Sequence, residues 1–183
     1  TPAGADSTAK GSVAATNACA GDNGGLTLPP GFCATIFAES LGHVRHLVVA
    51  ANGDVYANTW SGKYYPEGTT TPAPFLIAMR DSNHDGHADI IKRFGDSLAS
   101  GGAGGTGIAL YKGGLFAESK DRIVRYALDS AFTPTGAPTT IVSGLPLTGD
   151  HPMHPFVIDS SGMLFMDVGS RTNSCQVKSR TSK

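Results

Sequence analysis

The sequence predicts an all-β fold, and its composition and lack of helical patterning support this. Of the 183 residues, 24 are glycine and 11 are proline, which suits short strands joined by tight turns. No segment keeps the apolar spacing of an amphipathic helix over three turns, and no apolar run approaches a membrane-spanning length. A formal net charge of −1, with Lys and Arg scattered, argues against a nucleic-acid-binding surface.

A repeat of strand pairs narrows the fold class to a β-propeller. Three segments share an apolar strand, a tight turn and a second apolar strand, and they begin 60 and then 49 residues apart. This spacing is close to that of a four-stranded propeller blade, and a β-sandwich, the alternative, would not repeat in register. The segments are HLVVAANGDVYANT (46–59), TGIALYKGGLFAES (106–119) and PFVIDSSGMLFMDV (155–168). Their turns, which carry common hairpin signals, are Asn52-Gly53, Gly113-Gly114 and Ser161-Gly162.

The repeat also indicates that the propeller is incomplete. Further strands are expected at FLIAMR (75–80), ADIIKRF (88–94), RIVRYAL (122–128) and PTTIVSGL (138–145). These segments make at most about three blades, whereas propellers close with about four to eight. We therefore expect a flexible lead-in over residues 1–25, and residues 26–183 as the N-terminal part of one propeller domain. The end at Lys183, in a polar and basic stretch, is typical of a nick in an exposed loop.

The cysteines indicate an oxidising compartment. Cys19 and Cys33 flank a short segment that can close as a disulfide loop, although two unrelated thiols are the alternative. Cys175 is then left over, and an odd cysteine in an exported chain implies a partner outside this sequence. The chain starts at Thr1 without a visible signal sequence, so we expect any signal peptide to have been removed.

The segment DSNHDGHAD (81–89) has the residue types of a calcium loop. Oxygen ligands at alternate positions can converge on one hard cation, and the glycine permits the sharp turn. Lys92 stands where an EF-hand has Glu, so the loop is not a complete EF-hand. The alternative is a polar β-turn without metal. The predicted ligands are the side chains of Asp81, Asn83, Asp85 and Asp89 and the carbonyl of His87.

The segment GDHPMHPF (149–156) contains the candidate catalytic residues. Asp150, His151 and His154 precede the first strand of the third hairpin, and in a propeller such strands begin around the central channel. Histidine is suited to proton abstraction near neutral pH. The alternative is that one or both histidines bond structurally to loop carbonyls. GGAGGTG (101–107) departs from nucleotide-binding fingerprints and is expected to be a glycine-rich crossover between blades.

Several strings together resemble the bacterial sorbosone/glucose dehydrogenase family, between about Leu28 and Gln176. The resemblance implies a six-bladed β-propeller, of which this chain supplies about the first half, and location in the periplasm or outside the cell. It also implies pyrroloquinoline quinone (PQQ) bound with Ca²⁺, and oxidation of a sugar or related alcohol or aldehyde with electrons passed to an acceptor. The strings are LPPGFCATIFAESLGHVRHLVVAANGDVYANTWSG, DGHADIIKRFGD, GGTGIALYKGGLFAE and GLPLTGDHPMHPFVIDSSGMLFMDVGS.

The resemblance assigns roles to individual residues. Asp150-His151 matches the motif that carries the family's catalytic base, so His151 is expected to remove the substrate hydroxyl proton as hydride passes to the quinone C5 carbon. Asp150 would orient or polarise this base. His151, Arg45 and His154 are expected to contact the cofactor.

The chain departs from the family pattern in one place and ends before other parts of it. Thr106 and its Gly and Ala neighbours stand where soluble glucose dehydrogenases have a glutamine. The later contacts to PQQ and to its calcium lie beyond Lys183, so most of the cofactor would be held outside this chain. Family members commonly carry a cysteine shortly after the position of Cys175, which implies a disulfide to the C-terminal remainder.

Two other classes of function stay open. One is a calcium-dependent propeller hydrolase of the lactonase type, for which Asp150 and Asn173 are candidate ligands. The other is a non-catalytic propeller used for binding.

Overall fold

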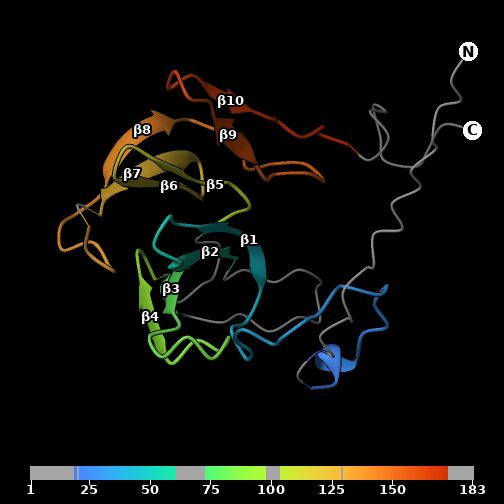
Figure 1. Ribbon diagram of the computed structural model, residues 1–183. Helices are drawn as coiled ribbons and strands as arrows, with labels where there is room; N and C mark the ends of the chain where they lie inside the picture. Colours follow the sequence, from blue (N-terminus) through green and yellow to red (C-terminus); the bar gives the residue numbers. More distant parts are fainter. Residues whose placement is uncertain (1–18, 20, 61–72, 98–103, 129, 173–183) are drawn as a thin grey trace, which may run out of the picture. The chain divides into compact units, whose positions relative to one another are not determined.

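The protein is all-β, as predicted. The computed structural model describes residues 19, 21–60, 73–97, 104–128 and 130–172. The chain divides into two compact units, Thr1–Phe37 and Ala38–Lys183. The described residues form ten strands in three antiparallel sheets and no α-helix (Figure 1). Among them we find no helix with the length and apolar character needed to cross a membrane.

The first unit contains the predicted disulfide between Cys19 and Cys33, which is confirmed. A short 3-10 helix, η1 (Asn23–Gly25), lies inside the disulfide loop, and the carboxylate of Asp22 accepts a hydrogen bond from the amide of Gly24 at 3.0 Å. Other predictions fall outside the described residues: the lead-in residues 1–18 and 20, part of the glycine-rich segment (101–103), and Asn173, Cys175 and Lys183.

The strands of the second unit follow the predicted repeat. The first sheet is ordered β1 (Val44–Val49), β2 (Val55–Thr59), β3 (Leu76–Arg80) and β4 (Ile90–Phe94). The second is ordered β5 (Ile108–Tyr111), β6 (Gly114–Ser119), β7 (Arg122–Ala127) and β8 (Thr139–Ser143). The third pairs β9 (Phe156–Ile158) with β10 (Leu164–Met166). Four antiparallel strands, each paired to the next in the chain, are the pattern of a propeller-like blade.

The turn between β5 and β6 lies one residue earlier than predicted. Gly114 already belongs to the strand, where it pairs with Tyr111, so the two turn residues are Lys112 and Gly113. Both have positive φ, 42° and 69°. A type I′ turn requires this backbone, because its twist matches the twist of the flanking strands.

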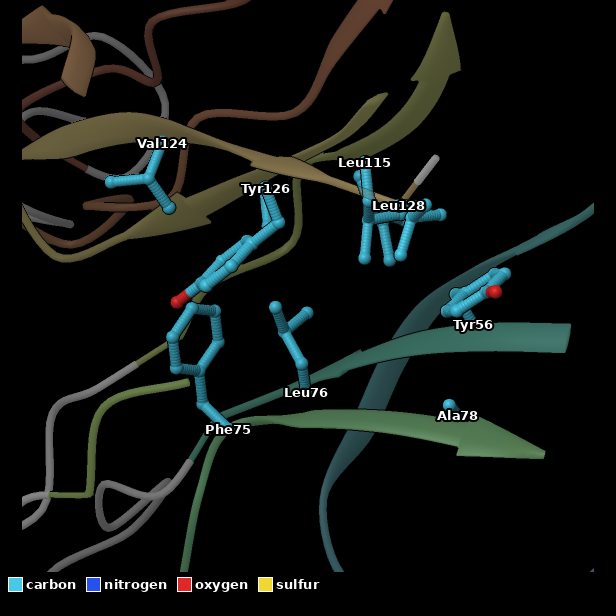
Figure 2. Packing of buried hydrophobic residues seen from close by; sticks show 10 residues of the cluster. Tyr56, Phe75, Leu76, Ala78, Leu115, Val124, Tyr126 and Leu128 are labelled. Carbon is cyan, nitrogen blue, oxygen red and sulfur yellow. The ribbon is translucent and has the colours of Figure 1, made fainter. Parts of the chain in front are cut away.

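The first two sheets pack face to face through one apolar core (Figure 2). The ring of Phe94 in the first sheet meets that of Tyr126 in the second edge to face, with centroids 5.6 Å apart. Full burial of one large apolar side chain stabilises a fold by about 1.5–3 kcal/mol, so this core contributes much of the free energy that holds the two sheets together. Its buried members are Tyr56, Phe75, Leu76 and Ala78 in or directly beside the first sheet, and Ile108, Leu115, Ala117, Val124, Tyr126 and Leu128 in or directly beside the second.

Strand β6 is buried on both faces. Leu115 and Ala117 belong to the first core, whereas Phe116, between them, joins a second core with Leu145 and Phe156. This follows from the alternation of side chains along a strand. Side chains of β9 and β10 pack against the second core, so the second sheet lies between the first and the third. The three sheets therefore stack as successive propeller-like blades.

An ion pair between a buried carboxylate and a half-buried arginine holds the loop between β1 and β2 to the end of β3. Asp54 is 2 % exposed, and its carboxylate accepts two hydrogen bonds of 2.6 Å from the guanidinium of Arg80. That guanidinium also lies over the ring of Phe132, 4.5 Å from the centroid. The hydrogen bonds from Arg80 hold the pKa of Asp54 below its ordinary value, although burial acts in the opposite direction.

We expect Asp54→Asn to lower the free energy of unfolding of the full-length protein by about 2 kcal/mol, because Arg80 loses its charged partner. Since the pKa of Asp54 is lowered by folding, its stabilising effect is complete above the ordinary value of 3.8 and is lost as the pH falls below it. Urea unfolding at about pH 7 and about pH 3 measures this. A difference between wild type and variant that is equal at both pH values would contradict the assignment.

Candidate functional site

A cavity of about 680 Å³ brings together three of the predicted site residues, Arg45, Asp150 and His151. Its volume lies within the range of small-molecule sites, about 300–1,000 Å³. The other residues that line it are His46, Trp60, Thr106, Gly149, Pro152, Met153, Pro155, Asp167 and Gly169.

The cavity lies where the first strands of the three sheets come together. Arg45 and His46 belong to β1, Thr106 comes just before β5, and Pro155 comes directly before β9. Strand β5 contacts both β1 and β9. Since the first strands of propeller blades surround the central channel, this is the position expected for the segment 149–156.

His46 is a cavity residue that the sequence analysis did not identify. Its Nδ1 lies 2.8 Å from the carbonyl oxygen of Thr106. A carbonyl only accepts hydrogen bonds, so Nδ1 carries the proton, and Nε2 of the neutral ring is then a proton acceptor. The sequence feature that could have identified His46 is its position next to Arg45 near the start of the first strand.

The loop that carries His151 is held by close backbone contacts. The amide of Asp150 donates to the carbonyl of Arg171 at 3.1 Å. Gly149 has a φ of 108°, and a Cβ there would lie 2.6 Å from the same carbonyl oxygen. A Cβ on Gly169 would lie 2.7 Å from the Cβ of His151. Both glycines are therefore needed for the loop to lie against the segment after β10.

His154 is not in the lining of the cavity. It is 0 % exposed, and its Nδ1 lies 3.0 Å from Oε1 of Glu118, which is 1 % exposed. The same carboxylate oxygen accepts the backbone amide of His154 at 2.8 Å. The structure therefore separates the two histidines: His151 lines the cavity, whereas His154 is enclosed between the second and third sheets.

The glycine-rich segment before β5 has a structural reason for its composition. The second carboxylate oxygen of Glu118 accepts the amides of Thr106 at 2.7 Å and Gly107 at 2.9 Å. A Cβ on Gly105 would overlap the carboxyl group of Glu118. The side chain of Asn58 donates to the carbonyl of Gly107 at 2.8 Å and accepts the amide of Gly105 at 3.2 Å. Small residues thus let this backbone approach two buried polar side chains.

The loop 81–89 forms a turn held by its own hydrogen bonds. The carboxylate of Asp81 accepts the amides of Asp85 at 3.2 Å and Gly86 at 2.8 Å. The carboxylate of Asp89 accepts both the amide and the hydroxyl of Ser82, and the hydroxyl bond is the first cause of its lowered pKa. Among the residues that the structure describes, no group of three or more His, Cys, Asp or Glu side chains is placed to hold a metal ion.

The predicted calcium loop therefore has suitable ligand types, while in this structure its oxygens hold the turn. Asn83 accepts the amide of Asp85 at 3.2 Å, and Asp85 accepts the amide of His87 at 2.8 Å. Each carboxylate oxygen has two lone pairs, so one hydrogen bond leaves acceptor capacity. Calcium in this loop stays a prediction of the sequence.

Comparison with known proteins supports the fold. No family model and no curated protein match the sequence. Two solved structures of a Trichoderma reesei protein described as Carbohydrate-Active Enzymes Family AA12, an iodide structure and a calcium structure, resemble the chain with a TM-score of 0.56 and 14 % identity. The likeness is one of fold. It covers 74 % of this chain but 32 % and 31 % of those chains, so this chain spans about a third of their length.

If the loop 81–89 binds calcium, the ion should raise the melting temperature of the metal-stripped full-length protein by about 2–4 °C, because a ligand that binds only the folded state stabilises it. Differential scanning calorimetry with EDTA and with added Ca²⁺ measures the shift. Asp85→Asn should remove it. An unchanged melting temperature in the wild type would exclude the site and leave the hydrogen-bonded turn.

Proposed function

We propose that this chain is part of a PQQ-dependent dehydrogenase that oxidises a sugar or a related alcohol or aldehyde. The observation that carries the proposal is the meeting of Arg45, Trp60 and His151 in one cavity at the first strands of stacked sheets. The fold likeness to a carbohydrate-active enzyme supports a carbohydrate substrate. The sequence resemblance to sorbosone/glucose dehydrogenases supports the quinone.

Two residues of the cavity lining, Arg45 and Trp60, have the chemistry to contact a planar, anionic cofactor. PQQ is a fused-ring quinone with carboxylate groups, and a guanidinium such as that of Arg45 matches a carboxylate in both charge and shape. The indole of Trp60 offers an aromatic surface to a ring system. His154 was also predicted as a cofactor contact, but its ring is enclosed, so we assign it a supporting role.

The proposed chemistry divides between cofactor and protein. PQQ, when bound, supplies the oxidant that accepts a hydride from the substrate carbon. His151 accepts the proton of the substrate hydroxyl, which leaves the oxygen free to form the carbonyl as the hydride departs. Asp150, which the resemblance implies would orient this base, and Asp167 line the same cavity. A separate electron acceptor would then reoxidise the cofactor.

We propose further that the whole protein is a six-bladed propeller and that the C-terminal remainder of the polypeptide packs against this chain. The exposed apolar residues of the outer two sheets support this. Leu47 and Val49 in β1 are 55 % and 59 % exposed, and Val157 in β9 and Phe165 in β10 are 63 % and 56 % exposed. Further blades would bury these side chains. A disulfide from Cys175, as the resemblance implies, would link the two pieces.

The proposal includes export from the cytoplasm. The disulfide between Cys19 and Cys33 forms and persists in oxidising compartments such as the periplasm or the extracellular space. A periplasmic or secreted enzyme would reach sugars before they enter the cell.

We expect His151→Gln to lower the kcat of the full-length, PQQ-loaded protein by about 10²–10⁴-fold, because general-base assistance is lost. Turnover of aldoses with an artificial electron acceptor measures this. His84→Gln, in the loop between β3 and β4, is the matched control and should leave kcat unchanged. Near wild-type turnover of His151→Gln would exclude this base. Hydrolysis of lactones by the wild type, without quinone-dependent oxidation, would favour a hydrolase instead.

If the remaining blades accompany this chain as a disulfide-linked piece, intact-mass measurement of the natively isolated protein should show it. Under non-reducing conditions the mass should exceed that of this chain, and reduction should release two pieces. Alkylation without reduction is the control, because it leaves the disulfide intact. A folded, monodisperse species with the mass of this chain alone under both conditions would contradict the proposal.

A further inference from the structure

Glu118 is the most densely bonded buried side chain among the described residues, and no role was predicted for it. It lies near the end of β6, on the face that meets the third sheet, and it is 1 % exposed. Its carboxylate accepts three backbone amides, those of Thr106, Gly107 and His154, at 2.7–2.9 Å. The hydroxyl of Thr106, at 3.3 Å, and the ring Nδ1 of His154, at 3.0 Å, are further partners.

The partners of Glu118 belong to two walls of the cavity. Thr106 lines the cavity from the glycine-rich segment before β5. His154 lies within the segment 149–155, of which every other residue lines the cavity. Each oxygen of the carboxylate serves one wall: Oε2 bonds to Thr106 and Gly107, and Oε1 bonds to His154. A single side chain therefore fixes the separation of the two walls.

The network continues to the third wall, formed by β1. The carbonyl of Thr106, whose amide bonds to Glu118, accepts a hydrogen bond from His46 at 2.8 Å. On the other side, His154 is three residues from His151 in a loop stiffened by Pro152 and Pro155. Displacement of the Glu118 carboxylate would thus move His46 and His151 together.

The tautomer of the His154 ring follows from its hydrogen-bond partner. A carboxylate accepts hydrogen bonds, so we assign the ring proton of His154 to Nδ1, which lies 3.0 Å from Oε1 of Glu118. Nε2 of the same ring is buried and finds no partner among the described residues. The ring is therefore held through Nδ1, by Glu118.

We propose that Glu118 is a positioning residue of the site, which acts through His154 to hold the proposed base His151 in place and through Thr106 to hold the neighbouring wall that bonds to His46. This inference rests on the proposed function for its effect on turnover. The geometric part, that Glu118 holds the two walls together, does not depend on which reaction the cavity carries out.

The test compares Glu118→Gln with Asp54→Asn in the full-length protein. Glutamine keeps the size of the side chain but places an N–H₂ group among donors, so some of these hydrogen bonds are lost. Asp54 is a matched control, because it is a carboxylate of similar burial, 2 % exposed, that bonds to Arg80 away from the cavity. Both variants should have lower melting temperatures.

We expect Glu118→Gln to lower kcat by about 10²-fold with little change in KM, since a displacement of about 1 Å costs that much in a positioned site. Asp54→Asn should keep the wild-type kcat. Glu118→Asp, which retains the acceptors on a shorter side chain, should recover part of the loss. A kcat of Glu118→Gln within about threefold of wild type would overturn the proposal.

Amide hydrogen exchange of the cofactor-free protein supplies a readout besides activity. Exchange at 104–107 and 149–156 should be faster in Glu118→Gln and unchanged in Asp54→Asn. If the wild type proves inactive as a dehydrogenase, this local increase would still support the positioning role. Equal exchange in wild type and Glu118→Gln, or the same general increase in both variants, would overturn it. If Glu118→Gln fails to fold, His154→Asn replaces it in the test and should speed exchange at 149–156 alone. Unchanged exchange at 149–156 in that variant would also overturn the proposal.

Discussion

The architecture depends on β6, a central strand whose side chains are buried on both faces. In β6 the side chains of Leu115 and Ala117 contact the first sheet, while Phe116 contacts the third. Stacked sheets pack about 10 Å apart, so burial on both sides of β6 sets the spacing of all three layers. Because the layers are stacked in this way, their first strands come together at one place, and the cavity forms there.

The site occupies the position where this apolar stack changes to polar groups. Glu118 follows Ala117 in the same strand, and Asn58 follows Ala57 in β2, and both polar side chains are buried. The backbone just before β5 lacks a partner strand for several of its amides, and buried amides must be satisfied. The two side chains supply those hydrogen bonds. The hydrogen bonds that Glu118 and Asn58 make to the glycine-rich segment therefore also set the shape of the cavity.

Local chemistry made much of the fold predictable. Glycines in the turns marked the three hairpins, and the polar surroundings of Cys19 marked the disulfide, because each signal depends on neighbours in the chain. The turn after Tyr111 was misplaced by one residue, since two consecutive glycines allow either position and the pairing of Gly114 decides.

The site was harder to predict because it depends on distant contacts. Asp150 and His151 were foreseen from their place before a first strand, and the structure puts them in the cavity with Arg45. His154 has the same side chain in the same loop, and its burial depends on Glu118, 36 residues away. In the sequence, Glu118 is only a polar residue near the end of a strand. Its burial and its bonds to His154 depend on the third sheet, which packs against that strand. For the loop 81–89, spacing indicates the ligands, but the backbone decides where the oxygens point.

Two glycines lie directly behind the loop that carries His151, and their close contacts limit which substitutions the cavity can accept. Gly149 and Gly169 leave no space for a Cβ between the loop of His151 and the segment behind it. Insertions or larger residues there would push the loop inward and reduce the cavity. We therefore expect variation in what the cavity accepts to depend on its other lining side chains, such as Met153. The wall formed by the loop of His151 should thus tolerate little change, whereas selectivity for a ligand can change through the other lining residues.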